Sequence, residues 1–184
     1  MPIGLILLAL TASLAIQKPA PKPSPGAGPV IVMETVKGTI EFETYPEDAP
    51  KTVEHILNLV RRGFYNGLRV HRAGDMVVQL GDPQTRDMTK RDLWGRGPAA
   101  GSGKPIGVAE ISKRRTHRRG AVGMAHAGDP RLADSQFYIM RRAERSLDGK
   151  YAVFGQVVSG MDVVDRLEVT DIVRRAYVKG EKKP

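Results

Sequence analysis

The chain has 184 residues and a formal net charge of +9 at pH 7, and it contains no cysteine. This length suits one compact domain with extensions and is long enough to bury a hydrophobic core. The absence of cysteine excludes disulfides, zinc sites built on thiolates and a cysteine nucleophile.

The excess of lysine and arginine over aspartate and glutamate raises the question of whether the protein binds nucleic acid or other polyanions. The arginines, however, occur as scattered pairs, and aromatic residues make up only 5% of the chain. Proteins that bind single-stranded nucleic acid combine a basic groove with stacking aromatic side chains. We therefore expect no nucleic-acid partner, and we keep a basic scaffold that binds polyanions as an alternative function.

The chain begins with an apolar segment. Residues 3–16 read IGLILLALTASLAI, which is short for a membrane span but has the length of the apolar region of a signal peptide. No lysine or arginine precedes this segment. We interpret residues 1–16 as a signal peptide or an N-terminal anchor. The protein is then exported to a periplasmic or other extracytoplasmic location, and it contacts the membrane only if the segment stays uncleaved.

A proline-rich segment follows at residues 17–29, which read QKPAPKPSPGAGP. Its five prolines alternate with small or basic residues, a composition that favours extended polyproline II structure and does not pack a core. We interpret this segment as a linker. The folded domain is predicted over residues 30–178, and residues 179–184 form a short basic C-terminal tail.

Several short segments of the domain have the composition of β-strands. Residues 30–36 and 39–43 flank a Lys-Gly pair, which predicts a β-hairpin. Three further strand candidates, separated by turn residues, lie at residues 120–125, 135–140 and 151–158.

Two segments have the apolar spacing of α-helices. In the first, PEDAPKTVEHILNLVRRGFYNG, four apolar residues recur at helical spacing: Val53, Ile56, Leu57 and Val60. A proline near its start and Gly63 near its end are typical helix boundaries. The second helix is predicted over residues 160–167, with Asp162 as its cap.

Residues 84–107 are rich in glycine, proline and charge and are predicted to form a long surface loop. These elements favour a mainly-β fold with a closed or nearly closed antiparallel barrel.

The sequence lacks the residue motifs that most classes of enzyme require for catalysis. The sequence has no HExxH metal motif and no Gly-x-Ser-x-Gly elbow, and its carboxylates are scattered. The four histidines are not at metal-ligand spacing: His55, His71, His117 and His126. We therefore expect neither a metal nor an organic cofactor.

Five motifs in a fixed order point to a family. They are APKTVEHILNLVRRGFYNGLRVHR, QLGDP, RGAVGMAHAG, SQFYI and LDGKYAVFGQVVSGMDVVDRL. With these motifs the chain resembles the cyclophilin-type peptidyl-prolyl cis-trans isomerases, in a divergent, bacterial-like form, from about residue 30 to residue 167. The resemblance implies a closed eight-stranded antiparallel β-barrel capped by two α-helices. It also implies isomerisation of Xaa-Pro bonds in unfolded or partly folded proteins, and we expect the enzyme to be a monomer.

The resemblance further implies roles for individual residues. Arg72 matches the family's catalytic arginine, and Gln79 matches the glutamine that positions the substrate backbone. Four residues would form the apolar pocket for the proline ring: Met76, Val77, Tyr138 and Leu147. Three match positions that bind the peptide main chain: Ala125, His126 and Gln136. Tyr151 stands in the substrate-binding region where many members have histidine.

The chain departs from the family pattern beside the catalytic arginine. The segment HRAGDMVVQLGDP is one residue shorter than usual between Arg72 and the apolar run. Met76 replaces a pocket phenylalanine, and Ser146 stands where many members have an aromatic residue. Because a displacement of about 1 Å can cost on the order of 100-fold in rate, a catalytically weak module that binds proline peptides or acts as a chaperone is the alternative. Arg72 could also pair with Asp75 or Asp82 instead of contacting a substrate.

A shared site for Arg72 and Gln79 requires a break in strand register between them. Plain alternation places residues seven positions apart on opposite faces of a strand. We therefore predict two strand ends hinged at Gly74. We also predict that His71 has a structural role, since the reaction transfers no proton, and that Phe137 faces away from the pocket into the core.

Overall fold

The structure, a computed structural model, describes residues 24–97 and 100–184. The predicted signal peptide or anchor and the first part of the predicted linker lie outside these ranges. In the described part of the chain, no helix combines the length and the apolar character that crossing a membrane requires.

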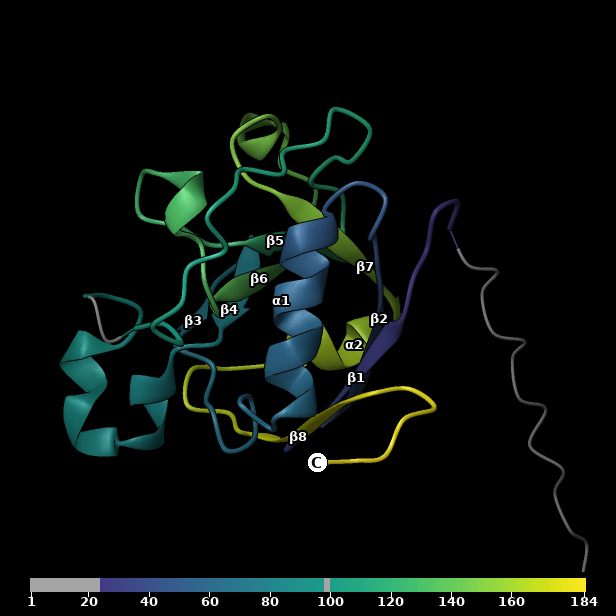
Figure 1. Cartoon of the computed structure of the whole chain (residues 1–184). Helices are drawn as coiled ribbons and strands as arrows, with labels where there is room; N and C mark the ends of the chain where they lie inside the picture. Colours follow the sequence, from purple (N-terminus) through teal and green to yellow (C-terminus); the bar gives the residue numbers. More distant parts are fainter. Residues whose placement is uncertain (1–23, 98–99) are drawn as a thin grey trace, which may run out of the picture.

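The fold is mainly β, and its strands form one curled antiparallel sheet (Figure 1). The eight strands are β1 (Val30–Thr35), β2 (Gly38–Thr44), β3 (Arg72–Ala73), β4 (Val77–Leu80), β5 (Ala121–Met124), β6 (Phe137–Met140), β7 (Val153–Ser159) and β8 (Val173–Val178). Their order in the sheet is β3-β4-β6-β5-β7-β2-β1-β8. The predicted hairpin and the three further strand candidates are confirmed, whereas β8 was not among the predicted strands.

The closed barrel that the sequence predicted is not confirmed, because the sheet ends at β3 and β8. The segment before β3 approaches the segment before β8 through an isolated bridge between Arg69 and Ile172 and a few backbone hydrogen bonds. At this seam Thr170 has a positive φ of 83°, which a β-branched residue rarely adopts. Its N–H nevertheless donates to the carbonyl oxygen of Val70 at 2.9 Å, so the seam is joined by these single bonds rather than by a ladder between the two end strands.

Aromatic rings fill the centre of the core inside the curled sheet. The ring centroid of Phe137 lies 5.9 Å from that of Phe42, 5.9 Å from that of Phe154 and 5.5 Å from that of Tyr65. All four side chains are at most 1% exposed. The prediction that Phe137 faces the core is therefore confirmed.

Helix α1 (Pro50–Arg61) is the first predicted helix. It begins with a proline, and Gly63, at a φ of 68°, follows its end as predicted. No side chain at its own start caps it. Instead, the carboxylate of Glu110 accepts hydrogen bonds from the backbone N–H groups of Lys51 and Thr52, at 2.9 and 2.8 Å. A residue far along the chain thus satisfies the free N–H groups of the helix start.

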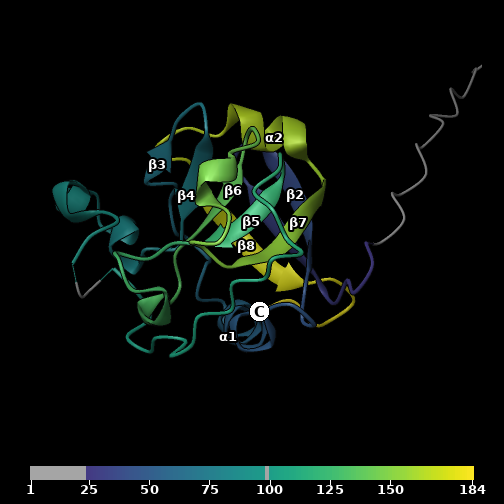
Figure 2. The same cartoon turned by 90° about the horizontal axis from the view of Figure 1, so that it is seen from above.

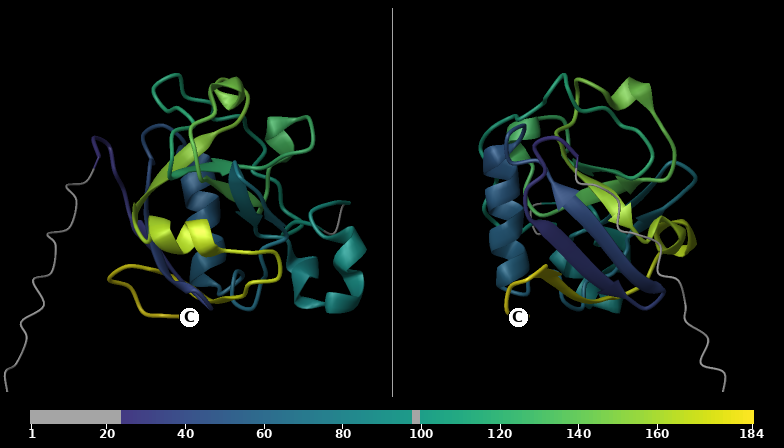
Figure 3. Two further views of the ribbon diagram at one scale, coloured as in Figure 1. Left: turned by 180° about the vertical axis from the view of Figure 1, so that it is seen from behind. Right: turned by 90° about the vertical axis from the view of Figure 1, so that its right-hand side faces the viewer.

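Helix α2 (Met161–Arg166) is the second predicted helix, and the sheet separates it from α1 (Figures 2 and 3). The prediction that Asp162 caps this helix is wrong. The cap position is Gly160, at a φ of 84°, where any side chain would collide with the backbone of Thr39. Asp162 lies in the first turn and accepts a hydrogen bond from Arg166 at 3.1 Å. Its carboxylate still lies where the helix dipole favours a negative charge.

The predicted surface loop over residues 84–107 is partly ordered by its own contacts. Trp94 is only 8% exposed, and its indole N–H donates to the carbonyl oxygens of Gln84 and Asp87. The loop contains two of the four short 3-10 helices of the described chain, which are η1 (Pro83–Arg86), η2 (Met88–Leu93), η3 (Pro130–Leu132) and η4 (Arg145–Leu147).

Residues 24–29, which the sequence assigned to the linker, contact the domain. The backbone N–H of Ser24 donates to the Glu43 carboxylate at 3.1 Å. The guanidinium of Arg115 donates to the carbonyl oxygen of Pro25 at 2.8 Å. The last part of the linker segment therefore follows a defined path along the domain.

Candidate functional site

A tight hairpin carries two of the predicted site residues. Strands β3 and β4 pair with Arg72 directly opposite Gln79. The turn between the strands is closed by a hydrogen bond from the N–H of Gly74 to the carbonyl oxygen of Val77, at 3.0 Å. The predicted break in register at Gly74 is therefore confirmed, and it brings the two polar side chains side by side.

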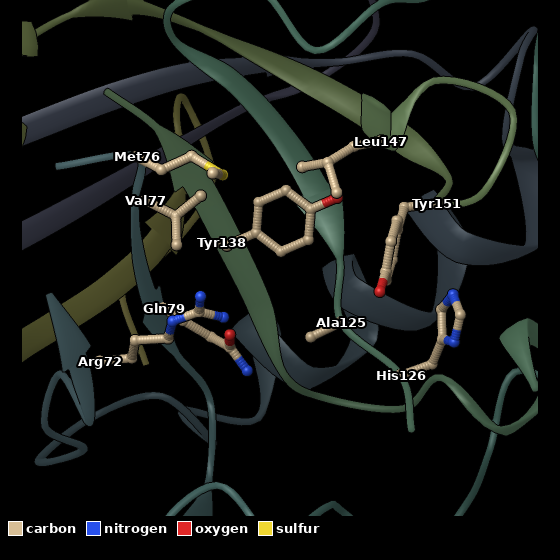
Figure 4. Close-up of a pocket in the computed structure, with 9 residues that line it drawn as sticks. All are labelled: Arg72, Met76, Val77, Gln79, Ala125, His126, Tyr138, Leu147 and Tyr151. Carbon is tan, nitrogen blue, oxygen red and sulfur yellow. The ribbon is translucent and has the colours of Figure 1, made fainter. Parts of the chain in front are cut away.

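A pocket of about 220 Å³ opens beside this hairpin (Figure 4). Nine residues line it, and all of them were predicted to belong to the site: Arg72, Met76, Val77, Gln79, Ala125, His126, Tyr138, Leu147 and Tyr151. Pockets for drug-sized ligands usually measure about 300–1,000 Å³. The smaller volume suits a single ring-sized side chain.

The inner wall of the pocket is apolar. Val77 and Tyr138 come from the neighbouring strands β4 and β6 and belong to a small apolar cluster beside the main core. Met76 and Leu147 pack against this cluster from the hairpin turn and from η4. The ring of Tyr138 lies against Gly123, where an added Cβ atom would be only 2.6 Å from the ring. Glycine at this position therefore allows the ring to pack closely on β5.

The guanidinium of Arg72 has no competing partner in the described part of the chain, where it makes no hydrogen bond or ion pair. The alternative that Arg72 pairs with Asp75 or Asp82 is therefore not supported. Asp82 is fully buried, and its carboxylate accepts hydrogen bonds from the backbone N–H groups of Gln84 and Gly95, at 2.8 and 2.5 Å.

The side chain of Gln79 is oriented by a neighbour. Its Nε2 donates to Oε1 of Gln136 at 3.0 Å, and Nε2 of Gln136 donates to the carbonyl oxygen of Ala100 at 2.7 Å. Gln136 does not line the pocket, but it holds Gln79 in place. With its Nε2 engaged, the amide of Gln79 presents its Oε1 for a hydrogen bond from a peptide N–H.

The far wall of the pocket is aromatic. The rings of His126 and Tyr151 stack with centroids 4.4 Å apart, and Nε2 of His126 lies 3.1 Å from the carbonyl oxygen of Lys150. Tyr151 meets Tyr138 edge-on at 6.0 Å. Ser146 is exposed and does not line the pocket, so the aromatic wall is built without it.

His71 lies outside the pocket lining. Both of its ring nitrogens are buried, and neither has a hydrogen-bond partner among the described residues. Burial lowers the pKa of this imidazole, and the carboxylate of Asp82 offsets the effect only in part. A neutral, packed ring fits the predicted structural role.

The lining of the pocket offers groups that bind and form hydrogen bonds. No carboxylate lines it, and within residues 24–97 and 100–184 no three His, Asp or Glu side chains gather as a metal site. The lining offers an apolar bed, one unpaired guanidinium, the amide of Gln79, the imidazole of His126 and the phenols of Tyr138 and Tyr151. Such a set can hold an apolar ring and donate hydrogen bonds beside it.

Comparison with known proteins identifies the family. Residues 30–182 match the family model described as cyclophilin type peptidyl-prolyl cis-trans isomerase/CLD. The chain belongs to the cyclophilins. A probable peptidyl-prolyl cis-trans isomerase of Brucella abortus is 37% identical over 179 residues, which cover 96% of this chain and 91% of the relative. Peptidyl-prolyl cis-trans isomerase B of Bacillus subtilis is 37% identical over 142 residues, covering 77% and 91% of the two chains.

A solved structure supports the fold. A cyclophilin type isomerase of Cryptosporidium parvum, crystallised in the presence of the dipeptide Ala-Pro, matches with a TM-score of 0.69 and 22% identity, covering 83% of this chain and 99% of that one. The cyclophilin fold is thereby shown. The family membership carries the activity as well: the enzyme is a peptidyl-prolyl cis-trans isomerase that assists protein folding.

The shortened segment of this cyclophilin leaves the site assembled. Arg72 still lines the same pocket as Gln79 and Tyr138, because the tight turn at Gly74 pairs the two strand ends directly. Met76 reaches the pocket from this turn, as expected.

His117 was not among the predicted site residues, yet it contacts the pocket from behind. It is 2% exposed, and its Nε2 and Nδ1 atoms lie 2.8 Å from the Tyr138 hydroxyl and 2.8 Å from the Asp148 carboxylate. In the sequence it stands in the charged run KRRTHRRG, where no pattern marks it. Only the fold brings these three residues together.

Proposed function

We propose that Arg72 is the catalytic residue of this isomerase and that the apolar pocket holds the proline ring of the substrate. An Xaa-Pro amide isomerises slowly because partial double-bond character raises a barrier of about 18–20 kcal/mol. No covalent bond breaks during the rotation. The enzyme needs to hold the proline and to stabilise the twisted amide more than the planar one.

The twisted amide differs from the planar amide at the prolyl nitrogen. Twisting localises a lone pair on this atom, which can then accept a hydrogen bond. A guanidinium fixed beside the ring stabilises the twisted state more than the planar state, whose lone pair is delocalised. Arg72 suits this role because it is permanently charged and, in the described chain, its N–H donors are not engaged elsewhere.

The other lining residues are proposed to hold the substrate. Met76, Val77, Tyr138 and Leu147 form the bed of the proline ring, whose burial contributes about 25 cal/mol for each Å² of apolar area. Gln79 is proposed to accept a hydrogen bond from the substrate backbone. The remaining contacts to the peptide would come from Ala125, His126, Gln136 and Tyr151.

One observation carries the proposal: an unpaired guanidinium stands at the edge of an apolar, ring-sized pocket in a chain of the isomerase family. The related Cryptosporidium parvum protein, crystallised in the presence of Ala-Pro, supports an Xaa-Pro peptide as the ligand class.

Isomerisation of an Ala-Xaa-Pro-Phe peptide, followed by NMR exchange, tests the role of Arg72. We expect Arg72→Ala to lower kcat/KM by about 10²–10³-fold, the cost of removing one preorganised donor. The control is Arg174→Ala, which removes the same charge from an exposed position of β8 and leaves the rate within about twofold. Equal rates for the wild type and Arg72→Ala contradict the assignment. Peptide binding without turnover in the wild type would identify a proline-peptide binding module instead.

We also propose that the enzyme is exported. The apolar residues 3–16 have signal-peptide character, and the match to the Brucella abortus relative covers 96% of this chain, more than the domain alone. Fractionation of the native cells and N-terminal analysis of the protein test this proposal. A start after about residue 16 means cleavage, and an intact start in the membrane fraction means an anchor. An intact protein in the cytoplasmic fraction contradicts export.

The enzyme is proposed to act as a monomer on unfolded or partly folded polypeptides. Light scattering of the purified protein gives its mass in solution, and a stable dimer contradicts this part of the proposal. A polyanion titration at several salt concentrations tests the alternative of a basic scaffold, since steep salt dependence is the signature of contacts with phosphate or similar charges.

A further inference from the structure

His117 lies behind the pocket, against Tyr138 of the inner wall and Tyr151 of the far wall. We propose that it is a positioning residue that assembles the proline pocket without touching the substrate. The inference rests on the proposed function of the pocket. The side chain of His117 is only 1% exposed, so it acts through its neighbours.

Every polar group of His117 is engaged. Its Nδ1 lies 2.8 Å from Oδ1 of Asp148, and its Nε2 lies 2.8 Å from the hydroxyl of Tyr138. Its backbone N–H donates to the same oxygen of Asp148 at 2.7 Å, and its carbonyl oxygen accepts from the N–H of Glu144 at 2.8 Å. One residue thus joins strand β6 to the loop that contains η4.

The chemistry of the groups fixes the direction of these hydrogen bonds. An ionised carboxylate can only accept, so Nδ1 of His117 donates to Asp148, and in the tautomer with its proton on Nδ1 the ring offers Nε2 as an acceptor for the Tyr138 hydroxyl. Burial raises the pKa of Tyr138, so the phenol keeps the proton that it donates. Burial also raises the pKa of Asp148, but the hydrogen bonds from the backbone and ring of His117 outweigh it and hold that pKa below its usual value. The carboxylate is therefore charged at neutral pH.

The contacts reach three residues of the pocket lining. The ring of His117 stacks on Tyr138, with centroids 5.9 Å apart and 23° between the planes, and it meets Tyr151 edge-on at 6.4 Å. Asp148 follows Leu147 directly and stands three positions before Tyr151. Fixing the Asp148 carboxylate therefore positions Leu147 and Tyr151, while the hydroxyl bond positions the ring of Tyr138.

The bond to His117 also keeps the pocket apolar. It directs the hydroxyl of Tyr138 toward the imidazole and leaves the face of the phenol ring for the substrate. Without an acceptor, a buried hydroxyl is costly. The ring would then move to find water or another partner, at the expense of the apolar bed. Because Arg72 lies on a different strand and makes no contact with His117, the loss should weaken substrate binding more than turnover.

A double-substitution cycle on KM and kcat tests the proposal. We expect His117→Phe, which keeps an aromatic ring, to raise KM by about tenfold, the effect expected for one unsatisfied buried hydroxyl, with kcat within about threefold. His117→Gln retains a donor and an acceptor and should restore most of the affinity. In a Tyr138→Phe background the hydroxyl is gone, so His117→Phe should have a smaller effect on KM. The factor by which it raises KM should be at least about threefold smaller than in the wild type, as for directly coupled residues.

The control is His55→Gln, because His55 also pairs with a carboxylate, Asp134, at 3.1 Å but does not line the pocket. It should lower thermal stability and leave KM unchanged. Unchanged KM in His117→Phe, or equal effects of His117→Phe with and without the Tyr138 hydroxyl, would overturn the proposal. If His117→Phe does not fold, Asp148→Ala takes its place in the cycle, since that side chain is 28% exposed and tolerates truncation.

The cycle also separates this proposal from the proposed function. If the wild type binds an Ala-Pro peptide without isomerising it, the catalytic role of Arg72 fails. The Kd for the peptide, measured by NMR titration of the same variants, then replaces KM in the cycle. His117→Phe is still expected to raise this Kd by about tenfold.

Discussion

Gly123 decides where the ring of Tyr138 can lie. A Cβ atom at this position would be 2.6 Å from the ring, so Gly123→Ala should push the ring toward the pocket opening. We expect a rise in KM of several-fold and a loss of about 1–3 kcal/mol in the free energy of unfolding, as for other overpacked sites. Peptide kinetics and chemical denaturation measure both effects. Gly74→Ala is the stability control, since a Cβ atom there meets nothing within 4 Å. An unchanged KM would show that the ring position does not set the affinity.

Thr170 holds a backbone conformation that suits glycine. Its φ of 83° costs an ordinary residue about 1–2 kcal/mol, whereas glycine loses about 0.5–1 kcal/mol of chain entropy on folding. We expect Thr170→Gly to raise the free energy of unfolding by up to about 1 kcal/mol, measured by guanidinium denaturation. Thr39→Gly, at an exposed position of β2 without a positive φ, should lower it. A clear loss in Thr170→Gly contradicts the account of strain at the seam.

Asp48 joins the turn before α1 to a distant loop. Its carboxylate is 1% exposed and accepts hydrogen bonds from Ser112 at 2.7 Å, Arg114 at 2.9 Å and Arg115 at 2.7 Å. Arg115 in turn holds the carbonyl oxygen of Pro25. Asp48 therefore positions one of the groups that hold residues 24–29 against the domain.

We expect Asp48→Asn to lower the free energy of unfolding by about 1.5–3 kcal/mol, because it removes hydrogen bonds between charged groups. Amide exchange at residues 24–29 should become faster. The control is Asp162→Asn. The side chains of Asp162 and Arg166 are 73% and 56% exposed, and an exposed ion pair of this kind should contribute less than about 1 kcal/mol to the free energy of unfolding. Unchanged exchange in Asp48→Asn would show that the segment is held by other contacts.

Local patterns were enough to predict the elements whose structure is local. The first hairpin and α1 follow from alternation, helical spacing and a terminal glycine. Strand β8 was not predicted because its apolar residues do not alternate regularly. Its pairing with β1 shifts register between Glu34 and Thr35 of β1, so the buried residues Val173 and Ala176 of β8 stand three positions apart. The cap of α1 was not predicted either, since Glu110 is 58 positions from the N–H group of Thr52.

The site shows the same division between local and distant contacts. The motifs and the apolar run between the first two of them predicted every residue that lines the pocket, because each of these segments carries its own lining residues. They did not predict His117, whose partners lie 21 and 31 positions away. Nor did they predict the seam between the segments before β3 and β8, where Arg69 bridges Ile172, a residue distant in the chain.

For the whole molecule, the carboxyls set the response to acid. The pKa of Asp134 is lowered: burial raises it, but hydrogen bonds from His55 and Ser102 outweigh burial. The pKa values of Asp48 and Asp148 are lowered in the same way. A lowered pKa means that the unfolded chain binds more protons than the folded chain in the interval between the two pKa values. Stability from these groups is therefore full above the unfolded value of about 3.9 and is lost as the pH falls below it.

We expect the free energy of unfolding to fall modestly as the pH drops below about 6.5, because unfolded His71 binds a proton that the buried ring, with its lowered pKa, does not. It should fall further and steeply below about pH 4, where the carboxyls are protonated. Urea denaturation at a series of pH values measures this profile. In Asp48→Asn the loss at low pH should be smaller, because one of the contributing groups is gone. A profile without a steep fall below about pH 4 would contradict the account.

The most direct test of the central claim is the structure of a complex with an Ala-Pro peptide. We predict that the proline ring lies on Tyr138 and that a guanidinium nitrogen of Arg72 is within hydrogen-bond reach of the prolyl nitrogen, about 3 Å. A proline ring bound elsewhere, or a guanidinium turned away from the prolyl nitrogen, would contradict the claim that this pocket and this arginine carry the isomerisation.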